Sequence, residues 1–191
     1  SATASAPLAQ EAQTPVTVAA ARAAEERYEG LSDHPFPTCF SCGTARDPDD
    51  ALCLRPGPLD DESGRYATSW IPREASVPLV WAALDCPGGW SAGIAWRPMV
   101  LGTMTTEVSA LPEPGVAHTV LAWHRGSQGR KHFSGSVLFA PDGRVLADAL
   151  DGDADRLVLC DERGEIIDGD AVMALCATRM LAEGRLAKGT L

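Results

Sequence analysis

The stretch LDGDADR gathers three carboxylates in this 191-residue sequence: Asp151, Asp153 and Asp155 stand at every second position, and Arg156 follows them. Carboxylates held this close disfavour one another's ionisation unless a cation offsets their charge. A bound divalent metal is therefore the expected reason for the cluster. An EF-hand calcium loop is a poor alternative, because Arg156 occupies the position that needs glycine and the flanking residues are strand-like.

A second candidate site is the pair Cys39 and Cys42 in HPFPTCFSCG, a stretch whose prolines and closing glycine predict an ordered loop. Two thiolates at this spacing can bind Zn²⁺, with His34 and Cys53 as the remaining ligands. The alternative is a reduced pair with no metal. The other cysteines stand in apolar stretches and are expected to be small core residues: Cys86, Cys160 and Cys176.

The elements that would position these residues combine one apolar helix with several strands. The segment SVPLVWAALDCPGGW is apolar almost all round, which predicts a buried helix ended by Pro87, Gly88 and Gly89. RYATSWI alternates as a strand before it, and GTMTTEVSAL, VAHTVLAWHR, KHFSGSVLFA and RVLADAL follow it. The clusters PEPG, GSQG and PDG between them are typical of turns linking antiparallel neighbours. We therefore expect an α+β fold, an antiparallel sheet around one central helix.

The two ends of the chain predict smaller elements. Residues 1–13 have a composition typical of a disordered tail, and TPVTVAAARAAEERY predicts a short helix with Thr14 as its cap. Near the other end, DGDAVMALCATRMLAEGRL predicts an amphipathic helix after a strand, the aspartate loop and a second strand.

Composition excludes several classes of protein. The net charge of −10 and the pI near 4.7 do not provide the basic face that nucleic-acid binding needs. No apolar run approaches the roughly 20 residues of a membrane helix, and the first residues lack the pattern of a secretory signal. We expect a soluble, cytoplasmic protein with no nucleic-acid or membrane partner.

HPFPTCFSCG, SWIP, WAALDCPGGW and FAPDGRVLADA together resemble a branch of the hotdog-fold, thioesterase-like proteins over about residues 34–148. The resemblance implies a homodimer that binds acyl-CoA or a similar thioester along the central helix. It makes Asp85 a general base or nucleophile, with backbone N–H groups at the helix start holding the oxyanion. Trp81, Gly88 and Gly89 would bind substrate. The alternative for Asp85 is a helix-end carboxylate bonded to the turn at Pro87–Gly89.

Residues 149–191 resemble the magnesium-loop segment of the phosphohexomutases, most of all phosphoglucosamine mutase. The resemblance implies Mg²⁺ at Asp151, Asp153 and Asp155, with Arg156 at a phosphate. The serine loop and sugar-binding domains of that family are not found in this chain, so phosphoryl transfer is not expected.

Three segments and three functions follow from these observations. The segments are a tail with a short helix at 1–33, a hotdog-like domain at 34–148, and a metal-loop fragment at 149–191. The leading hypothesis is an acyl-CoA-binding hotdog protein with thioesterase activity if Asp85 is active. The alternatives are a catalytically silent hotdog module and a Mg²⁺-dependent sugar-phosphate site.

Overall fold

The computed structural model describes residues 13–129, 131–151, 159–160 and 166–167. The chain divides into two units, Ser1–Asp155 and Arg156–Leu191, and each is described by itself. The predicted junction between residues 148 and 149 falls inside a strand of the first unit. The boundaries of the three segments stay a prediction.

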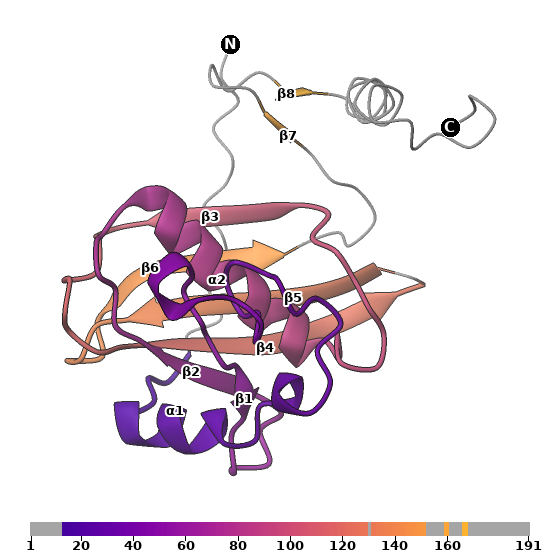
Figure 1. Ribbon diagram of the computed structural model, residues 1–191, viewed down its shortest axis with the longest axis horizontal. Coiled ribbons are helices and arrows are strands. Elements are labelled where there is room, and N and C mark those ends of the chain that lie inside the picture. The colour runs from indigo at the N-terminus through magenta and orange to yellow at the C-terminus, as the bar shows by residue number, and fades with distance from the viewer. Residues whose placement is uncertain (1–12, 130, 152–158, 161–165, 168–191) are drawn as a thin grey trace. The chain divides into compact units, whose positions relative to one another are not determined.

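A six-stranded antiparallel sheet forms the first unit (Figure 1). In chain order its strands are β1 Gly57–Pro58, β2 Tyr66–Trp70, β3 Met104–Val108, β4 His118–Gln128, β5 Lys131–Phe139 and β6 Val145–Asp151. The spatial order is β1-β2-β4-β5-β6-β3. Only β4, β5 and β6 form a meander, and the prediction that PEPG links two neighbours was wrong. β3 instead pairs with β6 at the opposite edge, where Met104 faces Asp151 and Val108 faces Ala147.

The central helix α2 spans Val77–Ser91 and packs on one face of this sheet (Figure 1). Val80, Ala83 and Leu84 lie fully buried among Val120 of β4 and Leu138 of β5. The N-terminal part of the helix is exposed on its other side, where Val77 is 48% exposed and Trp81 37% exposed. The prediction of an antiparallel sheet around one helix is confirmed, and this is the hotdog arrangement. The prediction of a helix buried all round was wrong.

Pro87 lies inside α2 and does not end it, in contrast to the prediction. Proline removes one helix N–H and pushes against the preceding turn, so the nearby carbonyls need other donors. Ser41 Oγ donates to the carbonyl of Ala82, and Ser136 Oγ of β5 donates to that of Leu84, both at 2.6 Å. These hydroxyls come from elements distant in sequence, and we infer that they stabilise the helix around Pro87.

A second helix, α1 Val18–Glu25, covers the other face of the sheet. Its Ala21 and Ala24 are fully buried against Leu121, Val137 and Phe139, which alternate along the strands with the residues that face α2. The predicted cap was wrong by one turn: Thr17 is the N-cap, and its side chain accepts from the N–H of Ala20 at 3.1 Å. The first unit is thus layered helix, sheet, helix.

The remaining elements are short. Two 3₁₀ turns, η1 Glu29–Leu31 and η2 Pro48–Asp50, lie on the path from α1 to the sheet. In the second unit, β7 Leu159–Cys160 and β8 Ile166–Ile167 pair antiparallel. The predicted C-terminal helix falls outside the described residues. In the part of the chain that the structure describes, no helix is long and apolar enough to span a membrane.

Candidate functional site

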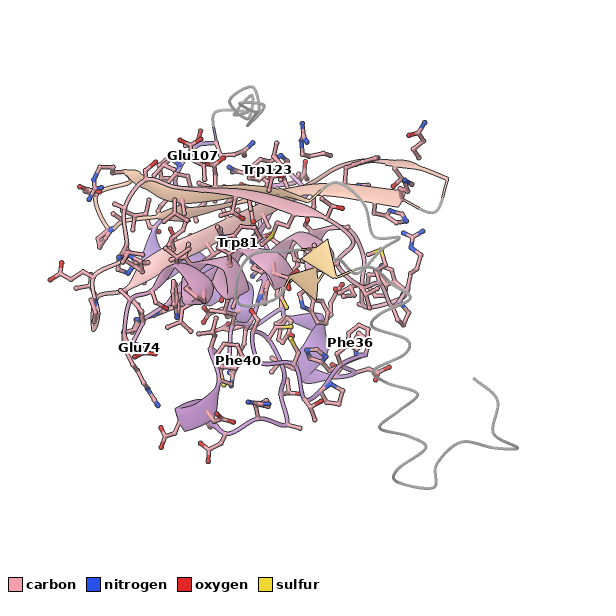
Figure 2. The ribbon with its side chains drawn as sticks, turned by 90° about the horizontal axis from the view of Figure 1, so that it is seen from above. Phe36, Phe40, Glu74, Trp81, Glu107 and Trp123 are labelled. Atoms are coloured by element: carbon pink, nitrogen blue, oxygen red, sulfur yellow. The ribbon has the colours of Figure 1, made fainter. Side chains whose placement is uncertain are left out.

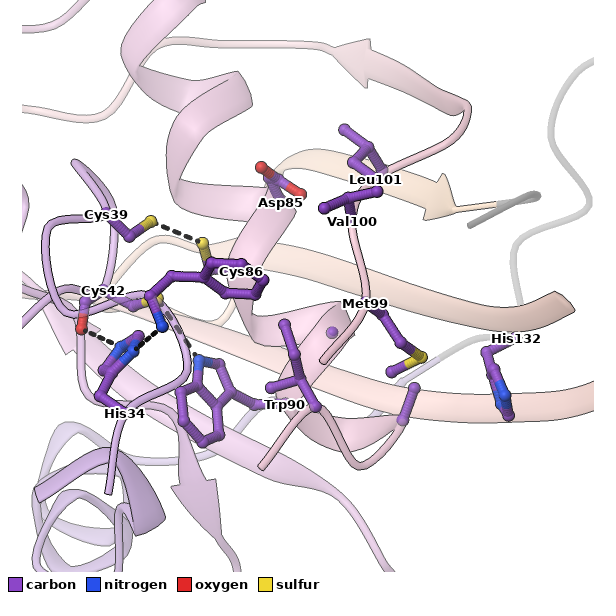
Figure 3. Close-up of a pocket in the computed structure, with 14 residues that line it drawn as sticks. His34, Cys39, Cys42, Asp85, Cys86, Trp90, Met99, Val100, Leu101 and His132 are labelled. Carbon is purple, nitrogen blue, oxygen red and sulfur yellow. Dashed lines mark hydrogen bonds between the residues drawn. The ribbon is translucent and has the colours of Figure 1, made fainter. Parts of the chain in front are cut away.

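A cavity of about 190 Å³ lies between α2, the segment His34–Cys42 and the chain at 99–101 (Figure 3). Its walls are mostly apolar, with one carboxylate and a group of thiols among them. The lining residues that enter the argument below are Cys39, Cys42, Asp85, Cys86, Trp90 and the run Met99–Leu101.

Asp85 is a partly buried residue of α2 that lines this cavity. Figure 3 shows its carboxylate near Val100 and Leu101, on the side of the cavity away from Trp90. Because Pro87, Gly88 and Gly89 are helical, Asp85 is not a helix-end carboxylate bonded to a turn, and that alternative was wrong. It also stands eight residues after Val77, about 12 Å along the axis, so the N–H groups at the helix start are too far away to hold the oxyanion of a thioester carbonyl beside Asp85.

Hydrogen bonds of hydroxyl and backbone groups help to hold the cysteine loop in place. Tyr28 Oη donates to the carbonyl of Cys42 at 2.9 Å, and Ser41 Oγ joins the loop to α2. The N–H of Gly43 donates to the carbonyl of Cys39 at 2.9 Å. A Cβ at Gly43 would lie 2.5 Å from two backbone oxygens, so the turn that joins the two cysteines fits only glycine. The positions of both thiols are therefore fixed by the backbone.

Cys86 of α2 completes a cluster with the two loop cysteines (Figure 3). The sulfur atoms of Cys39, Cys42 and Cys86 all lie within 4.8 Å of one another, and those of Cys39 and Cys86 are 3.5 Å apart. The indole Nε1–H of Trp90 donates to the sulfur of Cys42 at 3.4 Å. Cys86 packs against the core residues Tyr28 and Trp90, as expected, and in addition α2 turns its sulfur toward the loop, which the sequence did not predict.

Because the three thiols lie close together, their pKa values shift in opposite directions. Hydrogen bonds from Cys42 and then Cys86 hold the pKa of the Cys39 thiol well below its usual value. The interaction with Cys39 raises the pKa of Cys42 and of Cys86, and burial raises both further. Cys39 is thus the most acidic of the three thiols.

His34 and Cys53 do not join the sulfur cluster, contrary to the predicted ligand set. His34 Nδ1 accepts from the N–H of Phe36 at 2.9 Å, which leaves Nε2 as the donor to the carbonyl of Cys42 at 3.0 Å. Both ring nitrogens are therefore engaged in holding the loop. Cys53 is partly buried and belongs to a different part of the surface, lining a groove with Phe40 and Trp70.

The predicted substrate-binding residues divide between two environments. Gly89 lines the cavity together with Asp85, whereas Gly88 and Trp81 do not. Gly88 is buried against β5, where an added Cβ would lie 2.6 Å from Ser134 Oγ. Figure 2 shows Trp81 on α2 and places Phe36 and Phe40 on the segment that carries the cysteines. The assignment of all three as substrate-binding residues stays a prediction.

The predicted magnesium site is not described by the structure. Asp151 is the last residue of β6, but the placement of its side chain is not described. Asp153, Asp155 and Arg156 lie outside the described residues. The metal and phosphate roles of these four residues stay predictions.

Several cavity residues were not predicted from sequence. Trp90 follows Cys86 by one helical turn, a spacing that places both on one face of α2 and could have identified it. Met99, Val100 and Leu101 form an irregular segment, and no periodicity marks such a run as a cavity wall. His132 of β5 lines the far end of the cavity, and its Nδ1 lies 2.7 Å from Ser127 Oγ.

Comparison with curated proteins finds phosphoglucosamine mutases. The chain is 38% identical over 138 residues to the enzyme of Sorangium cellulosum, 35% over 136 to that of a Geobacter species, and 36% over 145 to that of Desulfovibrio desulfuricans. These alignments cover 70%, 70% and 73% of this chain, so they include residues before 149. They cover only 27%, 29% and 30% of the relatives, so the chain spans less than a third of their length.

Comparison with solved structures finds thioesterase superfamily proteins. The zebrafish thioesterase superfamily member 2 is 14% identical, with a TM-score of 0.48, over 73% of this chain and 98% of its own. A thioesterase superfamily protein of Shewanella loihica is 19% identical, with a TM-score of 0.40, over 48% and 82%. These likenesses are weak, and the hotdog assignment rests on the strand order and the packing of α2. No family model matches the chain.

Proposed function

We propose that this protein binds an acyl thioester, with acyl-CoA as the substrate class, in the cavity beside α2, and that Asp85 promotes its hydrolysis. The observation that carries the proposal is the placement of Asp85 in the wall of a mostly apolar cavity on the central helix of a hotdog fold. A concave apolar site with one convergent polar group is the usual form of a small-molecule site.

The cavity favours a short acyl group. Its volume of about 190 Å³ is below the roughly 300–1,000 Å³ typical of pockets for drug-sized ligands. Met99, Val100 and Leu101 would contact the acyl chain on one side, and Trp90 would close the opposite end. We therefore expect acyl groups of a few carbons to be preferred over long fatty chains.

Asp85 would act as a general base in the proposed reaction. Its carboxylate accepts a proton from water, the resulting oxygen nucleophile attacks the thioester carbonyl, and the C–S bond breaks as the protonated Asp85 returns the proton to the leaving sulfur, which releases the carboxylic acid and the CoA thiol. General-base assistance of this kind contributes about 10²- to 10⁴-fold to a rate. The oxyanion must be stabilised by a group other than the start of α2.

A panel of acyl-CoA substrates tests the proposal. Loss of thioester absorbance is the suitable readout, because thiol reagents would also react with the protein's own six cysteines. The Asp85→Asn variant should lose at least about 100-fold in kcat while still binding substrate, since the amide keeps the shape of the side chain. Glu74→Gln, which removes an exposed carboxylate outside the cavity, should match the wild type.

Each part of the proposal can fail separately. Equal turnover by the wild type and Asp85→Asn would contradict the role of Asp85. Binding of short acyl-CoA without hydrolysis would identify a catalytically silent hotdog module. If no thioester on the panel is bound or hydrolysed, the thioester assignment is wrong.

A second candidate function is a Mg²⁺-dependent site for a sugar phosphate at Asp151, Asp153, Asp155 and Arg156. The similarity to phosphoglucosamine mutases supports it. Mg²⁺ keeps several waters and relies on substrate oxygens, so we expect weak binding of the ion alone and tighter binding with glucosamine phosphate. Calorimetry on the wild type and on Asp153→Ala would show this difference. Equal heats for the two proteins would contradict the site.

A further inference from the structure

Three sulfur atoms from two distant parts of the sequence meet at the wall of the cavity. Cys39 and Cys42 come from the loop and Cys86 from α2, and the sulfur of Cys39 lies 3.5 Å from that of Cys86. Two thiolates at about 2.3 Å from a tetrahedral Zn²⁺ stand about 3.8 Å apart. The observed arrangement, with every pair within 4.8 Å, needs only small side-chain movements to reach this geometry.

The scaffold around the sulfurs is built independently of any metal. The Gly43 turn and the hydrogen bonds from Tyr28 and His34 to the carbonyl of Cys42 shape the loop, and Ser41 Oγ joins it to the carbonyl of Ala82 in α2. The indole N–H of Trp90 donates to the sulfur of Cys42 at 3.4 Å. Hydrogen bonds from outer groups to a ligand atom orient the ligand and stabilise its charge when a metal is bound. The ligand atoms are therefore placed in advance, with one of them already supported.

We propose that Cys39, Cys42 and Cys86 bind one thiophilic divalent ion, Zn²⁺, through three thiolates, with the fourth coordination position directed into the cavity. Soft thiolates select Zn²⁺ over the hard ions Mg²⁺ and Ca²⁺. Within the residues that the structure describes, no fourth ligand atom joins the group. Three protein ligands with one open position is the composition of a site that binds water or an exogenous molecule. This inference does not depend on thioester hydrolysis.

Cobalt substitution tests the site directly. Co²⁺ added to the reduced protein should give the near-ultraviolet charge-transfer band of thiolate ligands together with visible bands of tetrahedral intensity, at one ion per chain. Zn²⁺ should then displace Co²⁺ and abolish both. A Co²⁺ ion bound by the aspartate cluster would have oxygen ligands and would show no thiolate band, so the two sites are distinguishable.

Cysteine variants identify the ligands. Cys86→Ser should weaken Zn²⁺ binding by more than about 100-fold, since even changes outside the ligand shell cost 10- to 100-fold. The matched control replaces Cys53, Cys160 and Cys176 with serine together, which leaves only the three cluster cysteines. This control should bind one ion with the wild-type spectrum. Circular dichroism of each variant checks that the fold is retained.

Three outcomes would overturn the proposal. The first is the absence of a thiolate band in the reduced wild type. The second is an unchanged band in Cys86→Ser, and the third is loss of the band in the control that keeps the cluster. A Cys39–Cys86 disulfide that persists under reducing conditions, shown by mass spectrometry, would also exclude the site. Because the readout is spectroscopic, the result is independent of whether any acyl-CoA is hydrolysed.

Discussion

At the scale of single residues, burial shifts the pKa of ionisable side chains and so makes the stability of the protein depend on pH. Glu29 begins η1, four residues after the end of α1, and its Oε2 atom is buried with no hydrogen-bond partner. Burial raises the pKa of the Glu29 carboxyl above its ordinary value of 4.5. Burial raises the pKa of Tyr66 as well, and the charge of Glu29 adds to that effect. The ionised forms of Glu29 and Tyr66 therefore each lower the stability of the folded state.

Replacing Glu29 with glutamine should stabilise the protein at neutral pH. Because the folded state holds the Glu29 proton more tightly than the unfolded state, the wild type loses stability as pH rises from the ordinary pKa through the raised one. The gain in Glu29→Gln should be absent below the ordinary pKa of 4.5 and should grow above it. Urea denaturation across this pH range would measure it. Glu26→Gln, an exposed neighbour, should show no such trend.

Gly43→Ala should destabilise the cysteine loop. The new Cβ would lie 2.5 Å from the carbonyl oxygens of Pro37 and Cys39, which are backbone atoms and cannot move aside cheaply. We expect a loss of about 1–3 kcal/mol in unfolding free energy, the cost typical of overpacking. Thermal unfolding would show it. Thr44→Ala changes the next, exposed residue and should stay within about 0.5 kcal/mol of the wild type. Equal stability of the two variants would contradict the tight turn.

At the scale of elements, the helix α2 shows how distant contacts override a local rule. Two prolines and two glycines within Val77–Ser91 predict a short helix, yet it continues to Ser91. The hydroxyls of Ser41 and Ser136 donate to its carbonyls, and Gly88 lets the helix approach β5 closely. These contacts could not be read from the segment itself, because their partners lie about 40 to 50 residues away.

Alanine at each of the two adjacent glycines of α2 should have opposite effects. A Cβ at Gly88 would lie 2.6 Å from Ser134 Oγ, whereas the nearest atom to a Cβ at Gly89 is Ile94 Cδ1 at 3.4 Å. Alanine favours a helix interior over glycine by about 1 kcal/mol. Gly89→Ala should therefore be neutral or stabilising and Gly88→Ala destabilising in urea denaturation.

The double variant Gly88→Ala/Ser134→Ala tests the cause. Removing the Ser134 hydroxyl takes away the nearest atom and leaves Ser134 Cβ at 3.4 Å, so part of the lost stability should return. The reference for the double variant is Ser134→Ala alone, because Ser134 has interactions of its own. If Gly88→Ala costs as much stability in that background as in the wild type, the close contact is not the reason for the loss.

At the scale of the whole molecule, local patterns predicted the strands and the helices but not their neighbours. The strand-forming segments and the turn clusters between them are local features, and β2, β4, β5 and β6 were found where the sequence predicted them. The position of β3 beside β6 depends on pairing across the fold, which no local pattern encodes. The same limit applies to the site. Cys39 and Cys42 were predicted as a pair, but Cys86 is 47 residues from Cys39 and was missed.

The proposed homodimer predicts the mass of the particle in solution. β3 is an edge strand of the sheet, and its outer backbone groups are available to pair with a second copy. Light scattering after gel filtration should then give twice the 20.1 kDa mass of one chain. The mass of a single chain at micromolar concentration would contradict the dimer.

The short helix α1 has a consequence for the far face of the sheet. Leu121, Val137 and Phe139 are almost completely buried there, and Ala21 and Ala24 contribute to their cover. Without that helix, this apolar surface would meet water, and contiguous apolar surfaces promote sticking between molecules. The helix α1 therefore keeps this apolar surface away from water, and deleting α1 should make the protein prone to aggregate.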